Sequence, residues 1–267
     1  MSAVLHAEWT KLRTLRGAKL SLLCIFALMV GLGAIVGKLS NTDASLAGQG
    51  DDDVVQLALF GVLLAQIAAA TLGASLITSE YATGLIRTSF TATPQRGAVL
   101  AAKAIVLTAA TLPVALVAAA VAFLVAQPSL RGAGYIAPAY PPVTLADPGA
   151  FRAVAGTALL LSAYALLALG IGAIVRHAGA TIALTLALLL GPFIAHGLLS
   201  PDVRRYFDEA SPLAGLSVQS TTGQMLGMFG NNAGPLPIGV WGGLAVSFAW
   251  AGAALLIAYA LIRKRDA

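Results

Sequence analysis

Six long apolar stretches restrict the fold of this chain more than any other feature of its sequence. They cover residues 20–37, 54–78, 104–126, 153–175, 180–199 and 238–262. A helix needs about 20 apolar residues to cross a hydrocarbon layer of about 30 Å. Inside lipid, backbone amides and carbonyls must bond within the chain, so these stretches are predicted to be helices. The expected fold is all-α: a polytopic membrane protein with six transmembrane helices in a single domain, residues 1–267.

The charge content supports this class and indicates an orientation. Only 10% of the residues are charged and 58% are hydrophobic, whereas an average soluble domain is about one quarter charged. With the N-terminus inside, the cytoplasmic segments carry 11 of the 16 basic residues, as the positive-inside rule requires. Both termini are therefore expected in the cytoplasm. This rule also accounts for the net charge of +5, and nucleic acid is not an expected partner.

The segment before the first span, residues 3–16, has the pattern of a helix that lies in the membrane interface. Leu5, Trp9 and Leu12 fall within one narrow arc of a helix, and tryptophan favours headgroup depth. Glu8 interrupts this apolar face. The alternative is an ordinary basic flank of the first span.

Residues 79–103 form a polar, charged island between two of the most apolar stretches. Glu80 is expected at the cytoplasmic end of the second helix, where Gly84 permits a sharp backbone turn. A short surface helix is expected over 85–91, ended by Pro94. Such an element, tied to two membrane helices, would transmit force from another protein. A positive-inside loop without a partner is the alternative.

Two outer segments are expected to be irregular. Residues 127–150 contain five prolines, which predicts a loop. Residues 200–237 include a semi-apolar stretch, 211–230, that is too polar and glycine-rich to span, so a re-entrant or interfacial element is expected there. The acidic run at 51–53 is interpreted as solvated.

No catalytic, cofactor-binding or metal site is expected. The sequence lacks GxxxxGK[ST], HExxH, CxxC and GxSxG, and its three histidines lie in separate contexts. The chain therefore has no ATPase site of its own. Within the spans, polar side chains are few. Gln66 and Tyr164 are candidates for a substrate pathway, and hydrogen bonding between helices is the more frequent role of such residues.

The island resembles the membrane subunits of ABC-2 type ABC exporters, which serve bacterial multidrug, antibiotic and lantibiotic self-resistance. The resemblance is carried by the run SEYATGLIRT at residues 79–88, followed by Pro94, Arg96 and Lys103. Two further runs are similar to the family: LHAEWTKLR at 5–13 and LGIGAIVR at 169–176.

The resemblance implies an assembly. Two permease chains, identical or different, would work with two copies of a separate cytoplasmic ATPase that binds ATP and Mg. The N-terminal interfacial helix would be the family's elbow helix, and the island its coupling helix. The residues implied to contact the ATPase are Glu80, Tyr81, Thr83, Gly84, Ile86 and Arg87. The turn at Arg176 and His177 would be a second contact.

The function expected from these features is that of a permease subunit of an ATP-driven exporter in the bacterial cell membrane. It would move a drug, peptide or lipid-like substrate. Two alternatives stay open at this point. One is a membrane-embedded enzyme that acts on a lipid or isoprenoid substrate, and the other is a non-transporting membrane scaffold. The proline-rich 127–150 segment departs from the family pattern, so the substrate is not identified.

Overall fold

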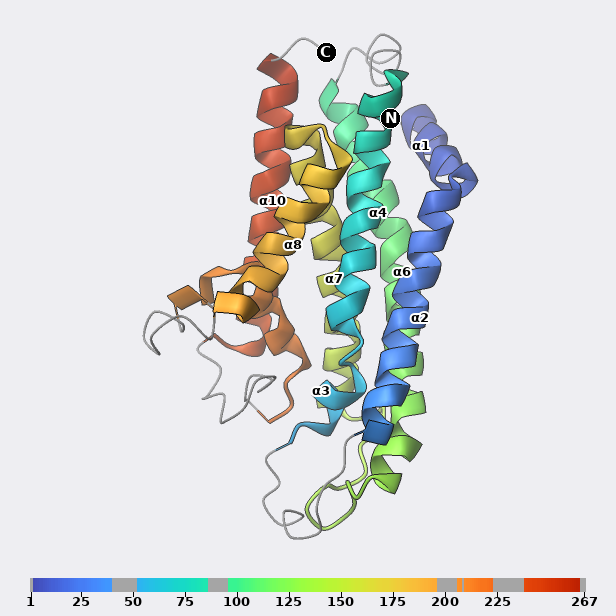
Figure 1. Cartoon of the computed structure of the whole chain (residues 1–267), viewed down its shortest axis with the longest axis vertical. Coiled ribbons are helices and arrows are strands. Elements are labelled where there is room, and N and C mark those ends of the chain that lie inside the picture. Colours follow the sequence, from blue (N-terminus) through green and yellow to red (C-terminus); the bar gives the residue numbers. More distant parts are fainter. Residues whose placement is uncertain are drawn as a thin grey trace.

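The computed structural model describes residues 2–39, 52–85, 96–195, 206–207, 209–222 and 238–264, and within these ranges it is all-helical without a strand (Figure 1). The elements are α1 (Ser2–Thr14), α2 (Arg16–Leu39), α3 (Val54–Ala58), α4 (Val62–Thr83), α6 (Arg96–Gly132), α7 (Pro148–Val175), α8 (Ala178–Ala195), the 3₁₀ helix η1 (Pro212–Gln219) and α10 (Val240–Lys264). The expected all-α class is confirmed.

Five helices among the described residues, α2, α4, α6, α7 and α10, are long and apolar enough to cross a membrane. The sixth expected span corresponds to α8, which has 18 residues and whose apolar part, Ala178–Pro192, is shorter than the others. The chain is therefore a multi-pass membrane protein, and the expected number of six spans is not confirmed.

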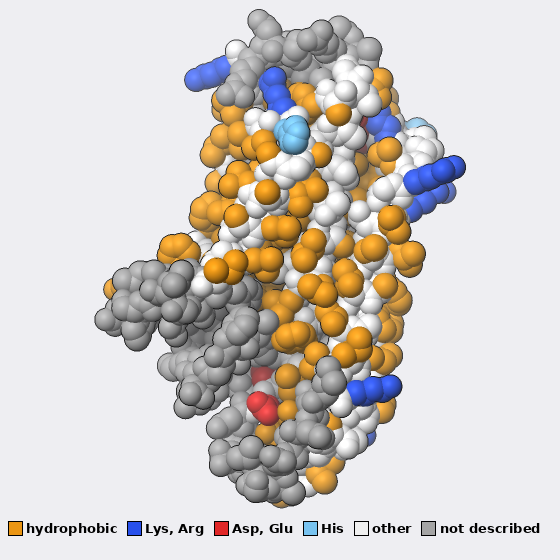
Figure 2. Space-filling view, viewed as in Figure 1, with side chains coloured by type: hydrophobic (Ala, Val, Ile, Leu, Met, Phe, Trp, Pro, Cys, Tyr) orange, Lys and Arg blue, Asp and Glu red, His pale blue; other side chains and the backbone are white. Residues whose placement is uncertain are grey.

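The long helices form one bundle with α7 and α4 at its centre. In the most apolar 18-residue window of α7, 78% of the residues are buried, against 17% in α2. α7 packs on α4, α6 and α10, while α2 lies outside against α6 and α4. Figure 2 shows one face of the bundle, on which hydrophobic side chains cover the middle and most Lys and Arg side chains lie near the upper end. This distribution matches a lipid-facing band with charged ends.

Two elements differ from the expected boundaries. The expected span 54–78 is divided into α3 and α4 by a turn at residues 59–61, where Gly61 lies so close to α2 that a Cβ would be 2.4 Å from the carbonyl oxygen of Met29. The expected span 104–126 lies inside the 37-residue helix α6. Because α6 continues to Gly132 with Pro128 inside it, the first residues of the expected 127–150 loop are helical.

The acidic run beside α3 is not simply solvated, contrary to the sequence interpretation. Asp53 is only 8% exposed, and its carboxylate accepts hydrogen bonds from the Val55 and Gln56 amides, capping the N-terminus of α3. The same carboxylate accepts bonds from the Thr221 hydroxyl and the Thr222 amide. Asp53 thus fastens the chain after η1 to the end of the bundle opposite α1.

The described part of the 211–230 stretch is a buried 3₁₀ helix, η1, packed against α7 and α10. The hydroxyls of Tyr164 and Ser247 both donate to the Pro212 carbonyl, at 3.1 and 2.8 Å, and the Gln219 amide donates to the Thr157 hydroxyl at 2.8 Å. The Pro212 carbonyl at the start of this short 3₁₀ helix and the Gln219 side chain at its end are thus bonded inside protein, as a re-entrant element requires at membrane depth.

Candidate functional site

The last turn of α4 is the centre of the candidate site, because the island begins there. The helix ends at Gly84, whose φ of 73° is left-handed and whose amide donates to the Tyr81 carbonyl. Glycine adopts this conformation without the steric cost that a Cβ imposes. The sharp turn expected at Gly84 is therefore present. Thr83 and Gly84 are exposed beside it.

A cluster of four charges joins α1, α4 and α6 at this turn. The Lys103 ammonium lies 2.7 Å from Glu8 Oε2 and 2.6 Å from Glu80 Oε1. The Lys11 ammonium lies 3.0 Å from both Glu8 Oε1 and Glu80 Oε1. We call these four residues the charge cluster. It contains two basic and two acidic residues, and each lysine forms ion pairs with both carboxylates.

Burial makes this cluster more consequential than a surface ion pair. Lys103 is 1% exposed, Glu8 3% and Glu80 7%. Removing one member of a buried ion pair costs about 3–5 kcal/mol in soluble proteins, because the other charge stays behind without its partner. These ion pairs thus hold α1, α4 and α6 together, because separating the helices would leave a buried charge without its partner or expose it.

The pKa of Lys11 reflects this environment. Its side chain is 41% exposed. Partial burial by itself lowers the pKa, but hydrogen bonds and charge interactions with Glu8 and Glu80 outweigh it, and the net pKa is raised above the ordinary 10.5. Lys11 therefore stays protonated at physiological pH.

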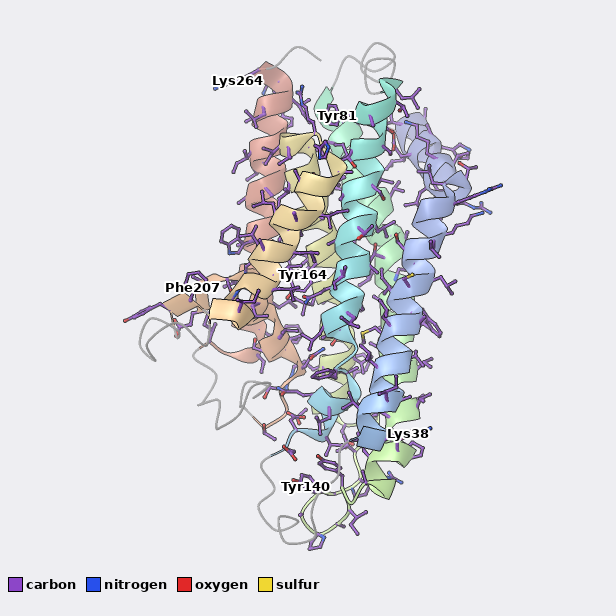
Figure 3. The ribbon with its side chains drawn as sticks, viewed as in Figure 1. Lys38, Tyr81, Tyr140, Tyr164, Phe207 and Lys264 are labelled. Carbon is purple, nitrogen blue, oxygen red and sulfur yellow. The ribbon has the colours of Figure 1, made fainter. Side chains whose placement is uncertain are left out.

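The neighbouring residue, Tyr81, contacts Arg176, which belongs to the second predicted ATPase contact. The Arg176 guanidinium lies 5.0 Å from the centre of the Tyr81 ring, within the range of a cation–π interaction. Arg176 ends α7 with a left-handed φ of 61°, which is uncommon for a residue with a Cβ. Figure 3 shows Tyr81 near the end of the bundle that also carries Lys264.

His177 directly precedes the next helix, α8, which begins at Ala178. Its Nδ1 accepts a hydrogen bond from the Ala180 amide at 3.2 Å, and its carbonyl accepts from Thr181. His177 is exposed, and these hydrogen bonds cap the N-terminus of α8. The structure thus places Arg176 and His177 at the same end of the bundle as Glu80 and Tyr81.

Not every expected site residue can be located. Ile86 and Arg87 lie outside the described residues, and contact with an ATPase stays a prediction for the whole set. Sequence reasoning missed Glu8, Lys11 and Lys103 as partners. A signal was present: Glu8 on an apolar helix face and Lys103 at the border of an apolar span would each be costly without an opposite charge.

The two pathway candidates have different surroundings. Tyr164 is fully buried and its hydroxyl is engaged with Pro212. Gln66 is also fully buried, but neither its amide nitrogen nor its carbonyl oxygen has a hydrogen-bond partner. No hydrogen bond joins the two residues, and a pathway role stays a prediction for both. The described residues contain no group of three or more His, Cys, Asp or Glu that could hold a metal.

The apolar bundle, with a charged end at which α4 and α6 are joined to α1 by the charge cluster, defines a multi-pass membrane protein. A family model described as ABC-2 family transporter protein matches residues 4–140, which are 137 of the 267 residues. The chain therefore belongs to the ABC-2 transporter family. No curated protein matches the chain.

Proposed function

We propose that this chain is the permease subunit of an ATP-driven exporter in the bacterial cytoplasmic membrane, with both termini in the cytoplasm. A separate ATPase subunit binds ATP and Mg and docks on the island. Two permease chains, identical or different, form the membrane part. The substrate is a drug, a peptide or a lipid-like molecule. Family membership supports the transporter class, and the finer statements are part of the proposal.

The observation that carries this proposal is the way in which both ends of the island are anchored. α4 enters it with Glu80 bonded toward α1 and α6, and with Tyr81 packed on Arg176 of α7. α6 leaves it with Lys103 in the same charge cluster. A force applied to the residues between these anchors therefore reaches four helices at once. A loop that only satisfies the positive-inside rule does not need such anchors.

On this proposal the six predicted contact residues divide into two roles. Thr83 and Gly84 are exposed and are expected to touch the ATPase directly, as are Ile86 and Arg87. Glu80 is nearly buried and Tyr81 half-buried, so they are positioning residues that hold the loop for docking. Arg176 and His177 support the same surface from the neighbouring turn.

The test compares a loop variant with a cluster variant in vesicles that contain the permease and its co-purifying ATPase. Arg87→Glu should abolish substrate-coupled ATP hydrolysis and leave the melting temperature of the permease unchanged. Lys103→Met should lower both the rate of substrate-coupled ATP hydrolysis and the melting temperature, because it leaves Glu8 and Glu80 with one lysine between them. Lys38→Met, an exposed cation at the opposite end of α2, is the matched control and should change neither.

A conservative variant separates charge pairing from simple loss of the lysine. Lys103→Glu should be inactive, because it places a third acid beside Glu8 and Glu80, and Lys103→Arg, which keeps the positive charge, should retain a substantial part of transport. Unaltered transport in Arg87→Glu, or transport by the purified permease without any ATPase, would refute the proposed function.

A further inference from the structure

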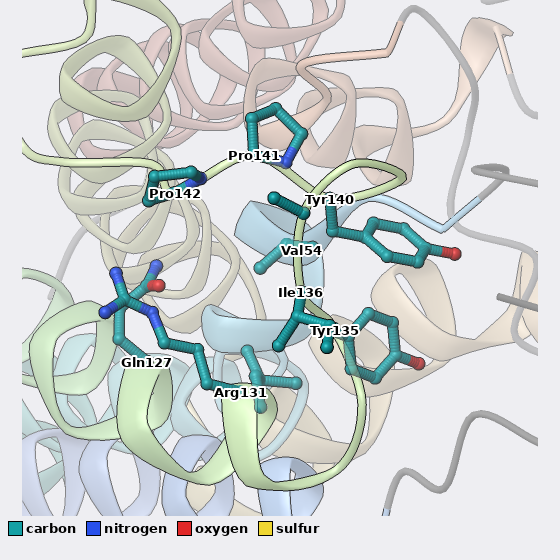
Figure 4. A pocket seen from close by; sticks show the side chains of 10 residues that line it. Val54, Gln127, Arg131, Tyr135, Ile136, Tyr140, Pro141 and Pro142 are labelled. Carbon is teal, nitrogen blue, oxygen red and sulfur yellow. The ribbon is translucent and has the colours of Figure 1, made fainter. Parts of the chain in front are cut away.

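A pocket at the opposite end of the bundle has no role in the function proposed above. It has a volume of about 180 Å³ and lies between α3, the end of α6 and the loop that follows α6 (Figure 4). An apolar protein cavity of about 150 Å³ accommodates benzene. The pocket is therefore large enough for one ring or one amino-acid side chain.

One wall of this pocket offers hydrogen-bond donors. Gln127 and Arg131 are four residues apart in α6 and so share a helix face. The Gln127 amide nitrogen is buried without a hydrogen-bond partner, and a buried donor in that state is unfavourable until an acceptor arrives. Arg131 is exposed and forms no ion pair with any residue that the structure describes. The NH2 group of Gln127 and the guanidinium of Arg131 can only donate, and the guanidinium is positively charged.

Most of the remaining residues that line the pocket are apolar or aromatic. Val54 and Leu130 contribute aliphatic surface, and Pro141 and Pro142 contribute fixed rings. The Tyr135 and Tyr140 rings stand edge to face, with centroids 4.9 Å apart.

None of the described residues that line the pocket carries a carboxylate. The carboxylate of Asp52 accepts a bond from the Tyr135 hydroxyl at 3.1 Å. Figure 4 shows that this hydroxyl points away from Arg131. Asp52 therefore lies on the tyrosine side of the site, and among the described residues no acid occupies the guanidinium.

We propose that this pocket binds a carboxylate attached to a ring-sized apolar group. The carboxylate accepts from Gln127 and Arg131, and the apolar group fills the space between the prolines and tyrosines. Charge-assisted bonds to arginine are about twice as strong as neutral ones. Two sources share this chemistry: a free aromatic acid, and the C-terminal residue of a peptide.

The experiment titrates the purified full-length protein in nanodiscs with benzoate, followed by saturation-transfer NMR. Benzamide has the same shape without the charge, and acetate has the charge without the ring. Benzoate should bind at least about tenfold more tightly than either, a difference of about 1.4 kcal/mol. Arg131→Met should remove this preference, and Gln127→Leu should weaken it. Lys38→Met should retain it, and nanodiscs without protein give the signal of ligand that only partitions into lipid.

A further arm distinguishes the two sources. If acetyl-phenylalanine binds at least as tightly as benzoate, the site takes peptide C-termini; if only benzoate binds, it takes free acids. Equal binding of benzoate and benzamide overturns the proposal. So does a preference that survives Arg131→Met. Because no ATPase or transport is measured, these outcomes are independent of the proposed function.

Discussion

Gln66 is the residue whose chemistry fits its surroundings least. A buried amide without partners costs about 1–3 kcal/mol for each unsatisfied group, and both polar atoms of Gln66 are in that state. Hydrogen bonding to a neighbouring helix, the more frequent role of such a residue, is absent in this conformation. Unsatisfied buried groups call for an explanation, and a second conformation in which α4 brings Gln66 to a partner or to substrate would supply one.

We expect Gln66→Leu to make the protein more stable and less active. Leucine has nearly the same volume and removes the unsatisfied amide, so the free energy of unfolding should rise by on the order of 1 kcal/mol. The transport rate should fall if the amide is used in another state. Thermal unfolding in detergent and vesicle transport measure the two effects. Gln219→Leu serves as the control, since the buried Gln219 side-chain amide donates to the Thr157 hydroxyl, and this change should destabilise. A lower melting temperature for Gln66→Leu would contradict this prediction.

At the scale of elements, the contact between α4 and α7 depends on the absence of a side chain. A Cβ placed on Gly73 would lie 2.0 Å from the Ala165 carbonyl oxygen, so the two backbones touch. Helix association in lipid relies on such close packing by small residues, because no hydrophobic effect drives it. These are also the two most buried spans. Their register is therefore set by a backbone contact.

Gly73→Ala should accordingly destabilise the bundle, by about 1–3 kcal/mol, the usual cost of overpacking. Gly31→Ala is the matched control, because nothing lies within 4 Å of a Cβ at that position in α2. It should leave stability unchanged or raise it by up to about 1 kcal/mol through helix propensity. Melting temperatures of both variants, measured in the same detergent, give the comparison. Equal effects of the two substitutions would show that the backbone contact is unimportant.

The attachment of α1 should depend on pH at the alkaline end. The pKa of Lys11 is higher in the folded protein than its ordinary 10.5. Its stabilising contribution is therefore complete below about pH 10.5 and is lost as the pH rises through the folded-state pKa. The melting temperature of the native protein should fall more steeply above pH 10.5 than that of Lys11→Met, which has no such group to titrate. Parallel curves for the two proteins would count against the raised pKa.

On the scale of the whole molecule, the two ends of the bundle are chemically different. One end carries α1, the charge cluster and the end of α10, while Lys38, Asp53 and the pocket lie at the other (Figures 1 and 3). Cysteine labelling measures which end faces outward. In a Cys24→Ser background, Lys38→Cys should react with a membrane-impermeant maleimide in whole cells, and Lys264→Cys should react only after the membrane is opened. The reverse pattern would invert the proposed orientation.

The sequence was sufficient for the class of fold but not for its contacts. Apolar stretches predict helices in lipid because the backbone has no other way to satisfy its hydrogen bonds, and Gly84 predicts a turn through its conformational freedom. Other features depend on neighbours that are distant in sequence. Glu8 is 95 residues from Lys103, and Asp53 is 168 residues from Thr221. The break before α4 likewise follows from the approach of α2 to Gly61, which local sequence does not reveal.

The unbroken length of α6 has a mechanical consequence. With Lys103 near one end and Gln127 near the other, about 36 Å apart at 1.5 Å per residue, this single helix is a rod that crosses the whole bilayer. Pro113 removes one backbone hydrogen bond part of the way along, so a bend in α6 would occur most easily there. A tilt of the helix as a rigid body would instead swing its two ends in opposite directions, so a movement imposed at the charge cluster would reach the distant pocket.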